Sequence, residues 1–227
     1  MGAVECRVKV RGVAGIPGSS IRKGFDTLAA VAKSLMDVLL TLLVAPVALV
    51  LVGGFAAILA LELRGNPFFV QTRVGLHGRP FRMYKLRTMR HATAGEEKTY
   101  AIEDWGEFVF SPPGAVDPRI TRFGAIARKT SIDELPNLLN VLKGEMSIVG
   151  PRPEIPEIVD QYPEEYHRRH DVLPGIAGLA QVMGRSDLAY ADIMQYDLQY
   201  VQKHGLLSDL GIILRTALQV AAGSGAR

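Results

Sequence analysis

Residues 130–153 read TSIDELPNLLNVLKGEMSIVGPRP, an apolar segment that begins at two adjacent acids and ends in a proline-rich turn. Ser131 and Glu134 have the S-x-x-E spacing of a capping box, which predicts a helix with Ser131 at its N-cap. Asp133 would lie in the first turn, where the helix dipole favours an anion. Gly144 is expected to end this helix.

The leucines of this segment recur at helical spacing and predict one buried face. They are Leu135, Leu138, Leu139 and Leu142. Capping and burial alone would explain the segment, so a purely structural role stays open. The paired carboxylates and the rigid turn at 150–153 also suit an active site that handles phosphate, because a carboxylate can serve as a nucleophile on phosphorus.

The chain has 227 residues, enough for one substantial domain. The single cysteine, Cys6, excludes an internal disulfide and suits a reducing compartment. The net charge of +3 is modest, so the distribution of charge matters more than its sum. We expect three parts: a mobile extension at 1–32, a membrane helix at 33–63, and a cytosolic domain at 64–227.

An uncharged run of 24 residues lies at 38–61. As a helix it would be roughly 36 Å long, enough to cross a hydrocarbon core of about 30 Å. Two features favour a re-entrant helix hairpin instead. Pro46 lies inside the run and would break the helix, and basic residues flank both ends, which favours the cytoplasmic side for each. Lys33 and Asp37 are four residues apart and are expected to pair and anchor the helix at the interface.

The stretch at 64–90 holds seven basic residues and no acid. Residues 68–70 and 81–89 read as short strands. The basic residues would face anionic lipid headgroups, or Lys85 and Arg87 would face a diphosphate. Farther along the chain, Arg119 follows an Asx-Pro turn and could steer an anion.

The C-terminal half is expected to be mainly helical. His167 and His170 lie three residues apart, but the arginines between them favour a solvated helix face over a metal site. From residue 190 onward, polar and apolar residues alternate with a helical period. The apolar face at 206–214 predicts an amphipathic helix that packs in the core or lies in the membrane interface.

Several separated motifs resemble the bacterial sugar transferase family, the monotopic phosphoglycosyl transferases. The resemblance extends from about Lys33 to the C-terminus. Its motifs are Gly75, the Phe81–Met89 segment, Asp117–Gly124, the 130–153 segment, Leu173–Ile176, and Tyr196, Asp197, Tyr200 and Asp209. The sequence differs from the family at Ser34, Leu179 and Met183, where the family usually has Arg, Trp and Asn.

The resemblance implies a fold and a reaction. The fold would be α/β but mainly helical, with a re-entrant membrane helix broken at Pro46, a compact catalytic domain with short strands, and interfacial amphipathic helices. Asp133 would attack the β-phosphate of a UDP-sugar and release UMP. Undecaprenyl phosphate would then take the phosphosugar from the enzyme, which would initiate assembly of a bacterial glycan.

The resemblance also assigns roles to individual residues. Asp133 would be the nucleophile and a Mg²⁺ ligand, and Glu134 would assist the metal or the incoming phosphate. The substrate-binding candidates are Lys85, Arg87, Arg119, Arg152, Gln181 and Arg185. Mg²⁺ is the expected cofactor, because a hard dication reduces repulsion between a carboxylate and a diphosphate.

The expected location is the cytoplasmic face of the bacterial inner membrane. The expected partners are the UDP-sugar, undecaprenyl phosphate, anionic lipids and a second copy in a homodimer, with no nucleic acid. Two other classes of protein stay open. One is a membrane-anchored, Mg²⁺-dependent phosphohydrolase, and the other is a non-catalytic scaffold with a single membrane span.

Overall fold

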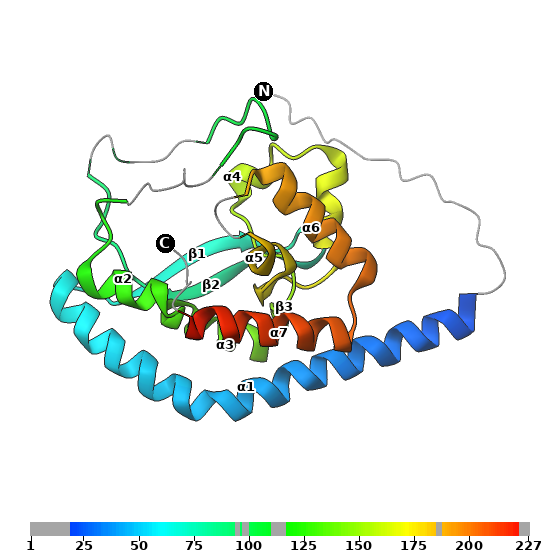
Figure 1. The fold of residues 1–227 in the computed structure, drawn as a ribbon, viewed down its shortest axis with the longest axis horizontal. Coiled ribbons are helices and arrows are strands. Elements are labelled where there is room, and N and C mark those ends of the chain that lie inside the picture. The colour runs from blue at the N-terminus through cyan, green and yellow to red at the C-terminus, as the bar shows by residue number, and fades with distance from the viewer. Residues whose placement is uncertain (1–18, 94–95, 97–99, 110–116, 185–187, 223–227) are drawn as a thin grey trace, which may run out of the picture.

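The computed structural model describes residues 19–93, 96, 100–109, 117–184 and 188–222. The fold is mainly helical, with two small sheets (Figure 1). The N-terminal half contains α1 (Ser19–Leu63), β1 (Phe68–Val74), η1 (Leu76–Gly78), β2 (Pro80–Leu86) and α2 (Arg122–Lys129). The acidic segment follows as η2 (Ile132–Asn137) and α3 (Leu138–Leu142). The remaining elements are β3 (Ser147–Val149), α4 (Pro156–Val159), η3 (Glu164–Asp171), β4 (Gly175–Ala177), α5 (Leu179–Met183), α6 (Tyr190–Lys203) and α7 (Leu206–Ala221).

The two predicted strands are confirmed as an antiparallel hairpin, in which Phe68 pairs with Leu86 and Val74 with Pro80. Their bounds differ from the prediction, because the first continues to Val74 and the second ends at Leu86 and not at residue 89. β3 and β4 form a second, parallel pair, with Ser147 opposite Gly175. Glycine is required where these two strands meet. A Cβ atom added to Gly150 would lie 2.3 Å from the carbonyl oxygen of Leu173, a distance that real side chains do not adopt.

Helix α1 begins at Ser19, within the part expected to be an extension, and runs without interruption through Pro46. The structure therefore does not show the predicted break. Figure 1 shows a clear bend near the middle of α1, as expected where a proline removes one backbone hydrogen bond. By length and composition, residues Leu28–Leu63 could cross a membrane.

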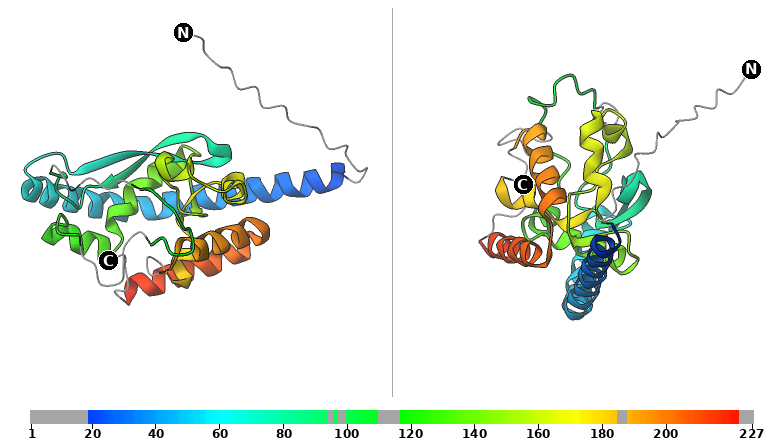
Figure 2. Two further views of the ribbon diagram at one scale, coloured as in Figure 1. Left: turned by 90° about the horizontal axis from the view of Figure 1, so that it is seen from above. Right: turned by 90° about the vertical axis from the view of Figure 1, so that its right-hand side faces the viewer.

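One side of α1 packs against the rest of the molecule between Asp37 and Leu59. The buried residues of this stripe are Asp37, Thr41, Ala48, Ala56 and Leu59. The helix contacts α2, η2, α3 and β3, and Figure 2 shows it lying alongside the other elements. The opposite side of α1 is exposed and apolar, with Leu43 75% and Val50 76% exposed.

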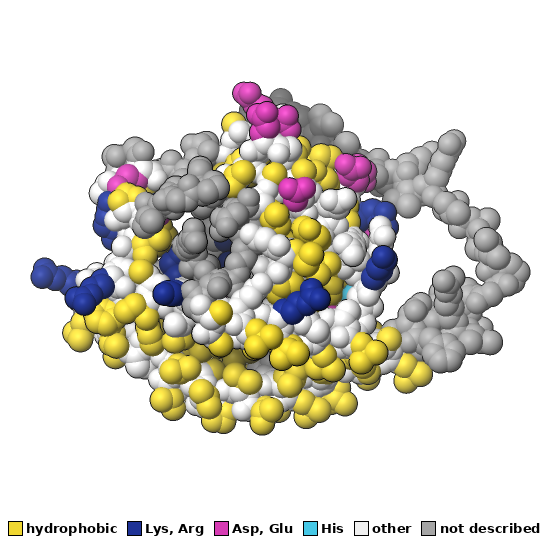
Figure 3. All heavy atoms as spheres, viewed as in Figure 1, with side chains coloured by type: hydrophobic (Ala, Val, Ile, Leu, Met, Phe, Trp, Pro, Cys, Tyr) yellow, Lys and Arg dark blue, Asp and Glu magenta, His cyan; other side chains and the backbone are white. Residues whose placement is uncertain are grey.

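The exposed apolar surface continues onto three other helices. Its members outside α1 include Phe123 and Ile126 of α2, Leu139 and Leu142 of α3, and Leu207, Leu210, Leu214 and Leu218 of α7. Figure 3 shows hydrophobic side chains gathered along the α1 side of the molecule. The predicted buried leucine face of the 130–153 segment is therefore wrong for Leu139 and Leu142. Helical spacing identifies an apolar face but not what covers it.

The prediction of a solvated face around His167 and His170 is also wrong for His170. Its ring is buried and stacks on Tyr162, with 6.1 Å between ring centroids. Burial lowers the pKa of His170 to about 4. This ring belongs to an aromatic core in which Trp105 and Phe108, from the acidic loop at 100–108, pack on Tyr190.

Candidate active site

The two acids lie in η2, which packs closely against β2. Ser131 precedes η2 with a left-handed backbone, at φ 57°, and its side chain caps nothing. The predicted capping box is therefore wrong, because the segment starts as a tight 3₁₀ turn and Glu134 points elsewhere. A non-glycine residue at positive φ is strained, and such residues cluster at functional sites. Gly144, at φ 72°, does end the helical segment as predicted.

Glu134 binds two cations that come from separate parts of the chain. Its Oε1 accepts a hydrogen bond from Nζ of Lys85 at 3.1 Å and another from Nη2 of Arg152 at 2.7 Å. Burial alone would raise the pKa of Glu134, but Arg152 and Lys85 outweigh it and hold that pKa well below its usual range. Glu134 is therefore an ionised carboxylate whose Oε1 is paired with two cations.

Asp133 is only 9% exposed, yet its carboxylate makes no hydrogen bond or ion pair with any residue that the structure describes. Burial, and then the charge of Glu134, raise the pKa of Asp133 to about 6. Lys85, Arg128 and Arg152 all oppose this rise. A carboxylate without a partner beside several cations has the free lone pairs that a nucleophile needs.

The cations at the site are themselves perturbed by one another. Burial, and then the neighbouring Arg152, lower the pKa of Lys85 to about 8. The charge of the neighbouring Glu134 raises the pKa of Arg152. With Arg128 and Arg73 also close enough to act electrostatically, the positive charges outnumber the two acids. This excess favours an anion at the site.

The turn at 150–153 carries Arg152 and is held by its backbone. The carbonyl of Pro151 accepts from the N–H of Gly175 at 2.9 Å, and that of Pro153 accepts from Nη1 of Arg73 at 3.0 Å. The carbonyl of Arg152 itself accepts from Nη2 of Arg169 at 2.7 Å. The rigid turn expected from the sequence is thus fixed from several elements at once.

The structure brings together Asp133, Glu134, Lys85 and Arg152 of the predicted site residues. The guanidinium of Arg87 binds the backbone carbonyls of Met89 and Asn66, because β2 ends one residue earlier. Arg119 forms a bidentate pair with Asp117. Gln181 donates to the carbonyl of Ile176 at 3.3 Å. None of these three contacts the acids in the described residues, and Arg185 lies outside them.

Lys33 and Asp37 do not form the expected ion pair. Lys33 reaches Asp209 at 2.5 Å and the carbonyl of Val149 at 3.2 Å. Asp37 accepts from the hydroxyl of Ser147 at 2.7 Å and from the N–H of Ile148. Buried partners across the fold replace the local partner, so both residues join α1 to the strand that leads into the 150–153 turn.

Sequence reasoning missed Arg73, Arg128 and Arg169 as parts of this arrangement. Arg73 and Arg128 could have been predicted from the sequence, because Arg73 lies in the same basic stretch as Lys85 and Arg128 lies just before the two acids. Nothing in the sequence indicated Arg169, because the polar segment around it favours a solvated face. In the structure its side chain is 2% exposed and pairs with Asp197.

The donor set fits a magnesium ion that is held mostly by substrate. The described residues contain no group of three His, Cys, Asp or Glu side chains able to hold a metal. Mg²⁺ is commonly bound by one or two carboxylates together with substrate phosphates and waters. The carboxylate of Asp133, which has no partner among the described residues, would supply one such ligand.

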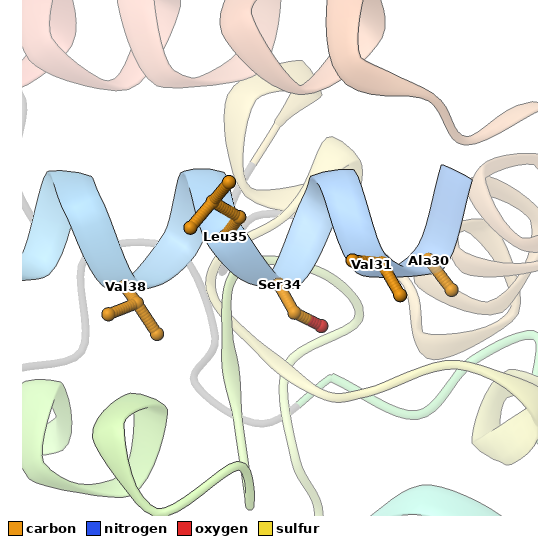
Figure 4. Close-up of a pocket in the computed structure, with 5 residues that line it drawn as sticks. All are labelled: Ala30, Val31, Ser34, Leu35 and Val38. Atoms are coloured by element: carbon orange, nitrogen blue, oxygen red, sulfur yellow. The ribbon is translucent and has the colours of Figure 1, made fainter. Parts of the chain in front are cut away.

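A shallow apolar hollow runs beside α1, lined by Ala30, Val31, Ser34, Leu35 and Val38 (Figure 4). It contains no titratable side chain, and none of its lining residues contacts Asp133 or Glu134 through a hydrogen bond or ion pair. Chemistry therefore belongs to the carboxylate cluster and not to this hollow.

The carboxylate of Asp133 is buried among cations and has no partner in the described part of the chain, and the domain carries one long apolar helix; together these features fit a membrane-associated enzyme. Comparison with known proteins agrees. The profile of the family described as bacterial sugar transferase matches residues 28–223. The chain belongs to this family and is a phosphoglycosyl transferase.

Three relatives illustrate the likeness. The exopolysaccharide production protein ExoY of Rhizobium meliloti is 34% identical over 92% of this chain and 88% of its own length. The UDP-glucose:undecaprenyl-phosphate glucose-1-phosphate transferase of Caulobacter vibrioides is 42% identical, over 81% of this chain and 67% of its own. An N-acetylgalactosaminephosphotransferase of Aeromonas hydrophila, which also acts on undecaprenyl phosphate, is 37% identical over 85% of this chain but only 44% of its own length.

Proposed function

We propose that this protein transfers a phosphosugar from a UDP-sugar to undecaprenyl phosphate through a covalent intermediate on Asp133. The observation that carries the proposal is the contrast between the two adjacent acids. Glu134 is engaged by Lys85 and Arg152, whereas Asp133 is buried and has no hydrogen-bond or ion-pair partner among the described residues. The names of the relatives supply the substrate class.

In the first step, a carboxylate oxygen of Asp133 forms a bond to the β-phosphorus of the UDP-sugar. The bond from that phosphorus to the bridging oxygen breaks, and UMP leaves with the oxygen. In the second step, a phosphate oxygen of undecaprenyl phosphate attacks the same phosphorus. The bond to Asp133 breaks, which restores the carboxylate and gives the lipid diphosphate sugar.

The chain's own cations would neutralise the phosphates during both steps, since phosphoryl transfer depends mainly on positioning and charge stabilisation. Lys85 and Arg152 are the first candidates, because Glu134 holds both beside Asp133. Glu134 thus orients the cations and does not itself attack phosphorus. Mg²⁺ on Asp133 and the diphosphate would supply further charge neutralisation.

We further propose that α1 enters one leaflet and leaves it on the same side. A helix that crosses the bilayer cannot be packed along its length by a domain outside the bilayer, yet the buried stripe of α1 runs from Asp37 to Leu59. The apolar sides of α2, α3 and α7 would rest in the same interface. In this arrangement the site would lie at the cytoplasmic surface, where a soluble nucleotide-sugar and a lipid phosphate can meet.

The decisive test is UMP release from a panel of UDP-sugars, with purified protein, Mg²⁺ and undecaprenyl phosphate. We expect UMP and a lipid-linked sugar from at least one donor, and loss of both when EDTA removes Mg²⁺. Inorganic phosphate or a sugar phosphate formed with no lipid product would identify a phosphohydrolase instead.

The membrane arrangement has its own test. Cysteines placed at residues 25 and 70, after Cys6→Ser, should label with an impermeant reagent from the same side of sealed vesicles. Labelling from opposite sides would establish a membrane span and refute the monotopic arrangement.

A further inference from the structure

Arg169 of η3 is a buried arginine that makes no hydrogen bond or ion pair with Asp133 or Glu134. Its Nη2 donates to Oδ2 of Asp197 at 2.6 Å and to the backbone carbonyl of Arg152 at 2.7 Å. Its Nη1 donates to the hydroxyl of Tyr162 at 2.5 Å. The side chains of Arg169 and Asp197 are each 2% exposed. This guanidinium therefore joins α6 and the aromatic core to the backbone of the 150–153 turn.

Arg152 is held at both ends by different groups. Its backbone carbonyl accepts from Arg169, while its own guanidinium donates to Glu134 at 2.7 Å. The flanking prolines have fixed φ angles and no N–H groups. Their carbonyls are bound by Gly175 and Arg73. Gly175 and Arg73 thus bind the prolines that flank Arg152, whereas Arg169 binds the backbone of Arg152 itself, the residue whose side chain pairs with Glu134.

We propose that Arg169 is a positioning residue for Arg152, and that Asp197 orients it in this role. The inference rests on the proposed function, since it concerns how the cation beside Asp133 is placed. Displacement of the Arg152 carbonyl would move its guanidinium relative to Glu134 and to the phosphate bound at Asp133. Arg169 would thus affect transfer without touching substrate.

Arginine suits this position because its planar fork serves several acceptors in fixed directions. At Arg169 the acceptors are a carboxylate, a carbonyl and a hydroxyl. A lysine would keep the charge opposite Asp197 but would present a single ammonium in place of the fork. Arg169→Lys therefore alters geometry while it leaves no buried carboxylate without a cation.

The test is a double-mutant cycle of Arg169→Lys and Arg152→Ala, read as single-turnover kcat/KM for UMP release. In the unsubstituted background we expect Arg169→Lys to lower kcat/KM by about 100-fold, the loss expected when a reacting group is misplaced by about 1 Å. In the Arg152→Ala background the same change should alter kcat/KM by no more than about twofold, because the two residues act as a unit. An equal loss in both backgrounds would overturn the proposal.

Two controls separate positioning from general damage to the fold. Arg168→Lys makes the same substitution at the exposed neighbouring residue and should leave kcat/KM unchanged. Ile158→Val lowers stability within the same core, where Ile158 is fully buried, and should also preserve kcat/KM in the folded protein.

A second variant covers the case in which Arg169→Lys does not fold. Arg169→Met combined with Asp197→Leu removes the buried pair without leaving a lone charge, and should show the same non-additivity with Arg152→Ala. If the unsubstituted chain releases no UMP, the proposed function fails and this role fails with it. If that chain is active and the losses are additive, only the role of Arg169 is refuted.

Discussion

Two buried aspartates, Asp133 of η2 and Asp197 of α6, both have a raised pKa but differ in the side chains that surround them. Burial raises the pKa of each to about 6. Asp197 is sealed against Arg169, whereas Asp133 has no partner in the described residues and a second acid next to it. The comparison teaches that a raised pKa alone does not identify a reactive carboxylate. The lack of a partner among the described residues is what makes Asp133, and not Asp197, the proposed nucleophile.

The largest expected effect of this difference is on activity. Asp133→Asn should lower transfer by about 10⁴-fold or more, the scale seen when a covalent nucleophile is removed. UMP release and mass spectrometry of the phosphosugar adduct would measure it. Transfer within about tenfold of the unsubstituted protein would rule Asp133 out as the nucleophile.

Asp197 should show its effect in stability instead. Asp197→Ala removes the side-chain acceptor and leaves the charge of Arg169 buried and unpaired, which costs about 3–5 kcal/mol. Urea unfolding in detergent at pH 7 would measure the change. The exposed Asp171→Ala in η3 is the matched control and should alter the free energy of unfolding by less than about 0.5 kcal/mol. An equal change in both variants would show that the Arg169–Asp197 pair adds nothing to stability.

The pH dependence of stability should reveal the strain at Asp133. Its folded pKa of about 6 lies above the ordinary value of 3.8 for an aspartate, so the folded state holds the proton more tightly and ionisation destabilises it. In EDTA, Asp133→Asn should therefore be more stable than the unsubstituted protein by about 3 kcal/mol above pH 6. This difference should shrink as the pH falls to 4. Asp197 titrates in both proteins, so its contribution cancels, and a difference independent of pH would contradict the assignment.

The smallest expected effect concerns the neighbour of Asp133. The charge of Glu134 raises the pKa of Asp133, second only to burial, and Glu134 also occupies Lys85 and Arg152. With Glu134→Gln, the stability gained from Asp133→Asn in EDTA should fall by about 1 kcal/mol. Unfolding of the single and double variants at pH 7 would measure this change. An unchanged gain would mean that burial alone accounts for the pKa of Asp133.

Much of the site could be predicted from local sequence. The adjacent acids, the proline-flanked Arg152 and the basic strand with Lys85 all carry recognisable patterns, and the structure brings them together. Pattern could not distinguish a capping Glu134 from an ion-paired one. A cap and an active-site acid have the same spacing in the chain, and only the partners that arrive from β2 and the 150–153 turn separate them.

The same limit explains the errors elsewhere. Lys33 and Asp37 have the spacing of a helical ion pair, but stronger buried partners lie in β3 and α7. Arg87 follows Lys85 by two residues, yet the strand ends between them and its guanidinium turns to backbone carbonyls. In each case a contact between residues distant in the chain displaced the local one.

The sequence by itself determined the family, the long apolar helix, the β1–β2 hairpin and the acids that define the site, because each depends on composition, periodicity or contiguous motifs. Only the tertiary structure decided which acid is engaged and which is free, which apolar faces are covered, and that Arg169 holds the backbone of Arg152. These properties depend on distances between elements far apart in the chain. Local sequence preferences do not determine those distances.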